Sequence, residues 1–193
     1  MQVKSLALLL AIAAGAAFSG CGDPTAIKAA FPNIDSKPLI FALNGTTSTI
    51  SAVSIRSGSA VPVDANFAFD VAMDINAQGQ VVVYTVRAVA SQLVSAHPVG
   101  LRVTDEPFDA IDRAPTSGFK YDSSMVLSVG KTVFIDEIDT FSCSPYSLLG
   151  QNIRAKMVID SVFIASRQIF LHVLSNPNCG FRSLVPGGEL PKD

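Results

Sequence analysis

The sequence predicts an all-β domain: an antiparallel β-sandwich with hairpin connections and one long irregular loop, preceded by a signal peptide and a short tether. Roughly eight to ten short segments after residue 37 are rich in Val, Ile and Phe, which pack well on a pleated surface. Turn residues separate these segments. No stretch after the leader shows the periodicity of an amphipathic helix.

The chain begins with a segment that has the pattern of a secretory signal peptide, residues 1–20. Lys4 precedes an uninterrupted apolar run of 13 residues, Leu6 to Phe18. This run is too short for a membrane-spanning helix, which needs roughly 20 apolar residues. A basic start, a short apolar run and small residues at its end are typical of a leader that is removed on export.

Two cleavage sites fit the end of this leader. Ala14, Ala16 and Ala17 would serve an ordinary A-x-A cut that releases a soluble protein. The run Phe18-Ser19-Gly20-Cys21 instead resembles the lipobox of bacterial lipoproteins, although that family usually has leucine where Phe18 stands. The resemblance implies a lipidated Cys21 as mature N-terminus, a lipid anchor in a membrane of the bacterial cell envelope, and a domain outside the cytoplasm.

The cysteine count favours lipidation. An exported chain with three cysteines has one thiol that is either free or modified. If Cys21 carries the lipid, Cys143 and Cys179 remain as a pair, and we expect a structural disulfide in an oxidising compartment. They lie in turn-rich segments at the two outer ends of the last predicted hairpin, which would bring them together; two free buried thiols are the alternative. A bridge closing about 36 residues stabilises by roughly 3–4 kcal/mol.

The mature chain is expected to consist of a flexible tether over residues 21–37 and one domain over residues 38–193. The first of these segments mixes Pro, Gly and polar residues without periodicity. Acidic residues outnumber basic ones and no basic cluster occurs, so the sequence does not indicate a nucleic-acid partner. The absence of Trp weakens the case for a sugar-stacking platform.

The first predicted hairpin joins residues 38–43 to residues 46–56 through Asn44-Gly45. Asn-Gly accepts the positive φ values that a two-residue hairpin turn requires. Both flanking runs contain the apolar and β-branched residues of strands. These observations predict two adjacent strands of one sheet.

The next two strands are expected over residues 66–75 and 80–89, with a turn between them. The first alternates apolar and polar residues, which indicates a half-buried strand with Asp70 and Asp74 on the polar face. The second is more continuously apolar and should be buried more fully. A shorter strand is expected over residues 97–104.

Residues 105–122 form the longest stretch without a strand pattern, and we expect one helical turn within it, around residues 108–113. Loops on a rigid scaffold commonly carry recognition. Phe108, Phe119 and Tyr121 lie in this stretch, which makes it the predicted binding loop.

Two hairpins are expected after this loop. The first joins residues 123–129 to residues 131–138 about Gly130, and the second joins residues 152–164 to residues 168–175. Each pair consists of two apolar runs separated by turn residues.

The sequence predicts no catalytic residue, no metal site and no cofactor. His97 and His172 are the only histidines, and neither belongs to a ligand or catalytic motif. No G-x-S-x-G nucleophile motif is present. Two groups of acidic residues are read as solvated carboxylates rather than calcium ligands; they are Asp136, Glu137 and Asp139, and Asp105, Glu106, Asp109 and Asp112.

We therefore expect a membrane-anchored envelope lipoprotein that acts as a non-catalytic interaction or assembly module. Its expected partners are the membrane, through the N-terminal lipid, and an envelope protein or a glycan. The alternative is a small-ligand or glycan binder that uses residues 105–122. A hydrolase with carboxylates paired only in space is a third hypothesis, because such pairs leave no fixed spacing in sequence.

Overall fold

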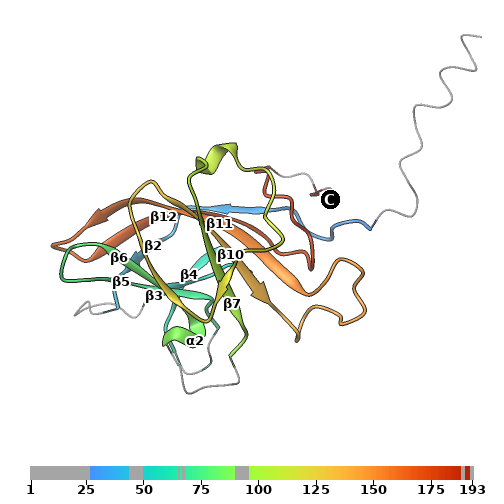
Figure 1. The fold of residues 1–193 in the computed structure, drawn as a ribbon, viewed down its shortest axis with the longest axis horizontal. Coiled ribbons are helices and arrows are strands. Elements are labelled where there is room, and N and C mark those ends of the chain that lie inside the picture. Colours follow the sequence, from blue (N-terminus) through green and yellow to red (C-terminus); the bar gives the residue numbers. More distant parts are fainter. Residues whose placement is uncertain are drawn as a thin grey trace, which may run out of the picture.

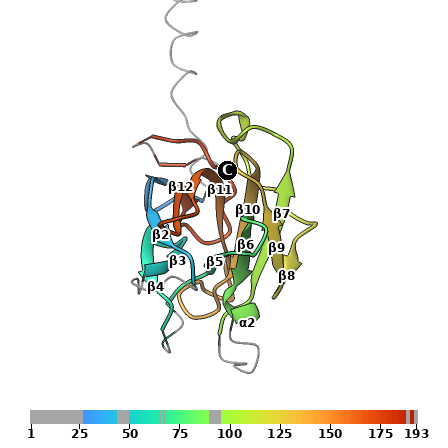
Figure 2. The same cartoon turned by 90° about the vertical axis from the view of Figure 1, so that its left-hand side faces the viewer.

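A computed structural model of the chain describes residues 27–43, 50–64, 66, 68–89, 96–187 and 190–191. These residues form two antiparallel sheets, so the predicted all-β sandwich is confirmed (Figures 1 and 2). The leader, Cys21 and the Asn44-Gly45 turn lie outside the described residues. None of the helices among the described residues is long and apolar enough to cross a membrane.

The larger sheet has seven strands, in the order β1-β12-β11-β10-β7-β8, with β2 also paired to β12. Its strands are β1 (Ile34–Ser36), β2 (Leu39–Phe41), β7 (Val99–Thr104), β8 (Lys120–Tyr121), β10 (Thr132–Ile138), β11 (Asn152–Phe163) and β12 (Gln168–Asn176). The predicted last hairpin is present as β11 and β12, with one register shift between Ile159 and Ser161.

The smaller sheet has five strands in the order β4-β3-β5-β6-β9. They are β3 (Ile50–Ser54), β4 (Ser59–Pro62), β5 (Val71–Ile75), β6 (Val81–Thr85) and β9 (Ser124–Leu127). The main core contains fully buried residues of both sheets, such as Val53 and Met73 from the smaller and Ile135 and Met157 from the larger. Burial of these side chains between the two layers is the chief stabilising contribution.

Two predicted hairpins are wrong. β2 pairs with β12 in the larger sheet, whereas β3 pairs with β4 and β5 in the smaller one. Likewise β9 pairs with β6, whereas β10 lies between β7 and β11. The physical reason is that two apolar runs flanking a turn have the same pattern whether the chain stays in one sheet or crosses to the other.

The strands predicted over residues 66–75 and 80–89 are both shorter in the structure. The first, β5, begins at Val71, and the second, β6, ends at Thr85, where a helical turn, α2 (Val86–Val89), follows. The backbone N–H of Val86 donates to the Asp70 carbonyl, 2.9 Å away. Apolar residues therefore continue past the end of the strand because Val86 is buried in the core as part of a helical turn.

The tether predicted to reach residue 37 is too long. β1 pairs with β12 through Ile34↔Ser175 and Ser36↔Val173. Before it, the Asn33 side chain donates to the carbonyls of Ser183 and Val185 at 3.0 Å each. Residues 29–37 lack an alternating pattern because β1 is a three-residue edge strand, and such short strands leave little periodicity in sequence.

Candidate functional site

A cleft of about 620 Å³ opens where strands of both sheets end. Val53 pairs with Val71, which brings the end of β3 beside the start of β5 in the smaller sheet. Glu137 pairs with Val99, which brings the end of β10 beside the start of β7 in the larger sheet. The antiparallel registers therefore gather residues from distant parts of the chain. The titratable residues that line the cleft are Arg56, Asp70, Arg87, His97, Glu137 and Asp139.

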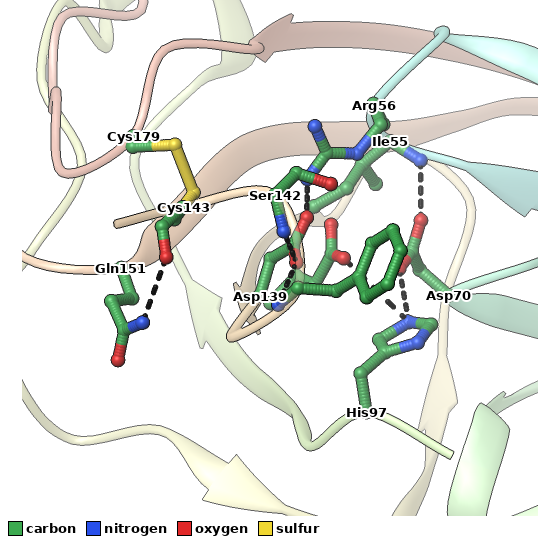
Figure 3. A network of polar contacts seen from close by, with 11 residues as sticks. Ile55, Arg56, Asp70, His97, Asp139, Ser142, Cys143, Gln151 and Cys179 are labelled. Carbon is green, nitrogen blue, oxygen red and sulfur yellow. Dashed lines mark hydrogen bonds and ion pairs between the residues drawn. A yellow bond between two sulfur atoms is a disulfide. The ribbon is translucent and has the colours of Figure 1, made fainter. Parts of the chain in front are cut away.

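Asp70 is the most deeply buried acid of the cleft, with a side chain 3% exposed. Its Oδ2 accepts a hydrogen bond from the Ile55 backbone N–H at 2.6 Å, and its Oδ1 lies 2.6 Å from His97 Nε2 (Figure 3). The prediction that Asp70 lies on the polar face of a half-buried strand is wrong. It directly precedes β5 instead of lying within a half-exposed strand, and its carboxylate turns inward to meet these partners.

His97 lies two residues before β7, and its ring lies near two carboxylates. Nε2 is 2.6 Å from Asp70 Oδ1 and 4.0 Å from Glu137 Oε1. Burial lowers the pKa of His97, but the hydrogen bond to Asp70 and the charges of Asp70 and Glu137 outweigh burial. The pKa of His97 is therefore raised above its ordinary value.

Glu137 places a second carboxylate at the floor of the cleft. It shares the face of β10 that carries Val133 and Ile135, so it occupies a core-facing position at the end of the strand. Its side chain is 7% exposed, and Oε2 has no hydrogen-bond partner among the described residues. Burial, reinforced by the charge of Asp70, raises the pKa of Glu137 to about 7.

The cleft also contains two arginines, each of which is paired with a carboxylate outside the central group. Arg56 forms an ion pair with Asp139, whose Oδ1 accepts from the backbone N–H groups of Phe141 and Ser142 at 2.8 Å each. Arg87 Nη1 lies 3.1 Å from Asp122 Oδ2. Asp70, His97 and Glu137 therefore form a distinct acidic centre.

The predicted disulfide is present beside this cleft. Cys143 and Cys179 are bonded, with their Cα atoms 5.6 Å apart (Figure 3). The bridge anchors the loop that joins β10 to β11, residues 139–151. Three side chains of this loop are almost fully exposed: Phe141 at 99%, Tyr146 at 91% and Leu148 at 90%.

The predicted binding loop, most of whose residues are exposed, packs onto the larger sheet through a few side chains. Phe108 is buried in a second hydrophobic cluster, against which Phe119 packs. Gly100 allows this approach, because a Cβ there would lie 2.8 Å from Phe119 Cβ. Tyr121 is 40% exposed, and its hydroxyl donates to Asp136 Oδ2 at 2.5 Å. Two of the three aromatic residues thus contribute to packing, and Tyr121 is the most exposed.

Lys156 holds the start of the same loop. Its Nζ donates to the carbonyls of Phe108 and Ile111 at 2.7 Å each and lies 4.4 Å from the Phe108 ring centroid. The expected helical turn is present as a 3-10 helix, Phe108–Ala110. His172 contacts the same aromatic ring, and its Nε2 is 2.7 Å from Asp35 Oδ1.

The first acidic group does not act as one unit. Asp136 lies on the opposite face of β10 from Glu137 and is bonded to Arg154 Nε at 2.9 Å and to Asn152 Nδ2 at 2.7 Å. Asp139 is paired with Arg56. Sequence reasoning grouped Glu137 with solvated carboxylates and missed its burial. The sequence did indicate this burial, because Glu137 follows Val133 and Ile135 at intervals of two residues and therefore lies on the same face of the strand.

No family model, no curated protein and no solved structure matches this chain. The geometry of the cleft and the residues of the leader are therefore the observations from which a function can be argued.

Proposed function

We propose that this protein is a lipid-anchored protein of the bacterial cell envelope that acts as a non-catalytic interaction module, with a partner docking over the Asp70–His97–Glu137 cleft. The match of Phe18-Ser19-Gly20-Cys21 to a lipobox supports the anchor. We choose this cleft as the docking surface because it contains the buried Glu137 carboxylate.

A buried carboxylate oxygen without a hydrogen-bond partner is costly, on the order of 1–3 kcal/mol or more when the group is charged. Glu137 Oε2 is such an atom, and the Glu137 side chain lines a cleft large enough to admit another group. Native proteins leave few buried polar atoms unsatisfied, and functional sites are one place where they do so. A bound partner would supply the missing contact.

The carboxylates of the cleft also raise the hydrolase hypothesis, because Asp70 and Glu137 converge there. A nucleophilic or general-base carboxylate needs a free oxygen that reaches the substrate. Both oxygens of Asp70 are hydrogen-bonded, one to His97 and one to the Ile55 N–H, and its side chain is 3% exposed. This geometry argues against Asp70 as the nucleophile or general base, and leaves Glu137 as the member of the pair with a free carboxylate oxygen.

A second cavity favours the alternative function, binding of a small ligand or glycan beside residues 105–122. It measures about 410 Å³ and is lined by Arg102, Gly118 and Lys120. Its charged groups are better satisfied: Arg102 Nη1 donates to the Ser117 carbonyl at 2.6 Å. We rank this cavity second because it has no buried unpartnered atom equivalent to Glu137 Oε2 among the described residues.

The anchor is tested by Cys21→Ser in the producing bacterium. The expected result is that the native protein sediments with membranes and incorporates labelled fatty acid, while the variant does neither and is recovered in the soluble fraction. Equal membrane association of both proteins would contradict the anchor.

The docking surface is tested by photo-crosslinking in native membranes. A photoreactive amino acid replaces Ser54, which lines the cleft, or Ser124, which is exposed on β9 as the matched control. We expect one dominant crosslinked protein from position 54 and none from position 124, with a weaker crosslink when Glu137→Gln is added. The same background pattern from both positions would refute docking at the cleft.

A further inference from the structure

We infer that Asp70, His97 and Glu137 form a binding site for one divalent transition-metal cation of the zinc class. The inference rests on the proposed use of this cleft as a binding site and names an ion within it. It does not depend on which partner docks there.

The donor atoms already lie within reach of one ion. One ligand atom from each residue can be chosen such that all lie within 4.8 Å of one another. Around four-coordinate zinc, with bonds of about 2.0–2.2 Å, neighbouring donors are roughly 3.3–3.6 Å apart. Asp70 Oδ1 and His97 Nε2 are closer than this, at 2.6 Å, and His97 Nε2 and Glu137 Oε1 are further apart, at 4.0 Å. Shifts of under about 1 Å would satisfy both separations.

The backbone holds the acidic ligands in place. The Ile55 N–H binds Asp70 Oδ2 and leaves Oδ1 directed at His97. Glu137 lies on β10, which is paired on both sides, with β7 and β11. Hydrogen bonds that orient metal ligands and rigid elements that carry them are what distinguish built metal sites from chance clusters.

A second observation, independent of the distances between the donor atoms, is the burial of Glu137. Its side chain is more than nine-tenths buried, it lines the cleft, and its Oε2 has no hydrogen-bond partner among the described residues. A cation bound by this carboxylate would compensate its buried charge. Two carboxylates and a neutral imidazole carry a formal charge of −2, which one divalent cation balances.

Neither arginine of the cleft donates a hydrogen bond to Glu137 Oε2. Arg56 is paired with Asp139, and Arg87 with Asp122. Arg87 Nε also donates to the Ala96 carbonyl at 2.6 Å.

The ligand types select the class of metal. Calcium takes six to eight oxygen ligands and magnesium prefers an oxygen octahedron, whereas imidazole suits zinc and its neighbours. One nitrogen and two carboxylates leave at least one position of a tetrahedral zinc ion open. That position would face the cleft, where water or a donor from the docking partner can fill it.

The test is a titration of the full mature protein with zinc alone, after treatment with a chelator and its removal. Equilibrium dialysis with elemental analysis gives the stoichiometry, and the shift of Tm with Zn²⁺, Ca²⁺ and Mg²⁺ gives the selectivity. The variants are His97→Gln and Glu137→Gln. His172→Gln is the matched control, because that histidine also contacts an aspartate, at 2.7 Å, yet forms no group of three ligands with the residues that the structure describes.

We expect one zinc per chain in the native protein and in His172→Gln, with a rise in Tm that Ca²⁺ and Mg²⁺ do not produce. In folded His97→Gln and Glu137→Gln, zinc affinity should fall by more than about 100-fold, beyond what loss of an outer-shell partner costs. If His97→Gln does not fold, the near-isosteric Glu137→Gln carries the test.

Absence of zinc binding to the native protein would overturn the inference, as would unchanged affinity in Glu137→Gln or loss of binding in His172→Gln. None of these results changes the crosslink expected from position 54. Failure of the metal site and failure of the docking surface are thus distinguishable.

Discussion

At the scale of single residues, Glu137 is the position where sequence and environment conflict most. Its neighbours on the same face of β10 are buried apolar residues, and it continues their phase to the end of the strand. An acid in such a position destabilises the folded state unless another group compensates its charge. This conflict is the kind that marks functional sites.

The first prediction concerns the pH dependence of stability in the presence of a chelator. The pKa of Glu137 is raised to about 7 in the folded protein, so the unfolded chain loses this proton first as pH rises. The folded state is therefore progressively destabilised from about pH 4.5 to about pH 7. Glu137→Gln removes this loss and should exceed the native free energy of unfolding by on the order of 2–3 kcal/mol at pH 8.

The measurement is urea unfolding of both proteins at pH 4 and at pH 8. At pH 4 the two free energies should agree within about 0.5 kcal/mol, because a protonated glutamate resembles glutamine. If the free energies of unfolding of the native protein and of Glu137→Gln differ by the same amount at both pH values, the raised pKa of Glu137 is contradicted.

The second residue-scale prediction concerns Lys156, which is 1% exposed and hydrogen-bonded to two buried backbone carbonyls. Lys156→Met retains the apolar stem but removes the Lys156 donor from both carbonyls, which leaves the Phe108 carbonyl with only the Ile111 N–H, 3.4 Å away. We expect a loss of about 2–4 kcal/mol in urea unfolding. Lys131→Met is the control: Lys131 pairs with the exposed Asp105, so its loss should change stability by less than about 1 kcal/mol.

At the scale of elements, most strands could be predicted from the sequence, whereas strand pairing could be predicted only in part. The β11–β12 hairpin was correctly predicted, because two long apolar runs flank a short turn and both stay in one sheet. β9 and β10 have the same local appearance, yet Gly130 lies between strands of different sheets and its N–H donates to the Ile159 carbonyl of β11, 2.9 Å away. A contact of that kind is tertiary and leaves no local signal.

The disulfide supports a prediction at this scale, since it ties the loop between β10 and β11 to the segment after β12. The bridge closes 36 residues. The double variant Cys143→Ala, Cys179→Ala should lose about 3–4 kcal/mol in urea unfolding. Reduction of the native protein should produce a similar loss. Unchanged unfolding midpoints after both treatments would contradict a structural role for the bridge.

At the scale of the whole molecule, the loop of residues 139–151 lies at the same end as the start of the described chain, on the right of Figure 1. Contacts confirm this placement: the Ala30 and Phe31 N–H groups donate to Asn178 Oδ1 at 2.7 and 3.0 Å, next to the disulfide at Cys179. From Cys21 to Ile27 the chain spans at most about 20 Å. A lipid on Cys21 would thus hold this end of the sandwich close to the bilayer.

The resulting prediction is that the exposed loop contacts the membrane surface. Residues 140–151 contain no charged side chain, and the chain contains no Trp, so Tyr146→Trp, in the same loop but outside the lining of the cleft, creates a single fluorophore. In lipidated protein reconstituted into vesicles, lipids with quenching headgroups should quench this fluorophore.

The control is Phe163→Trp, because Phe163 is also exposed and ends β11 about 36 Å along the strand from Asn152. It should be quenched far less. Equal quenching at the two positions would refute the orientation while leaving the anchor itself intact.

The sequence by itself determined the all-β class, most strand positions and the cysteine pair. These depend on local pattern: alternation, branched side chains, turn residues and cysteine parity. The tertiary structure alone decided which sheet each strand joins, and with it the site. Asp70, His97 and Glu137 meet because two antiparallel registers end at one edge of the sandwich. Local patterns carry no information about such long-range pairing. The core-facing position of Glu137 could nevertheless be predicted from the sequence, because it follows Val133 and Ile135 at intervals of two residues.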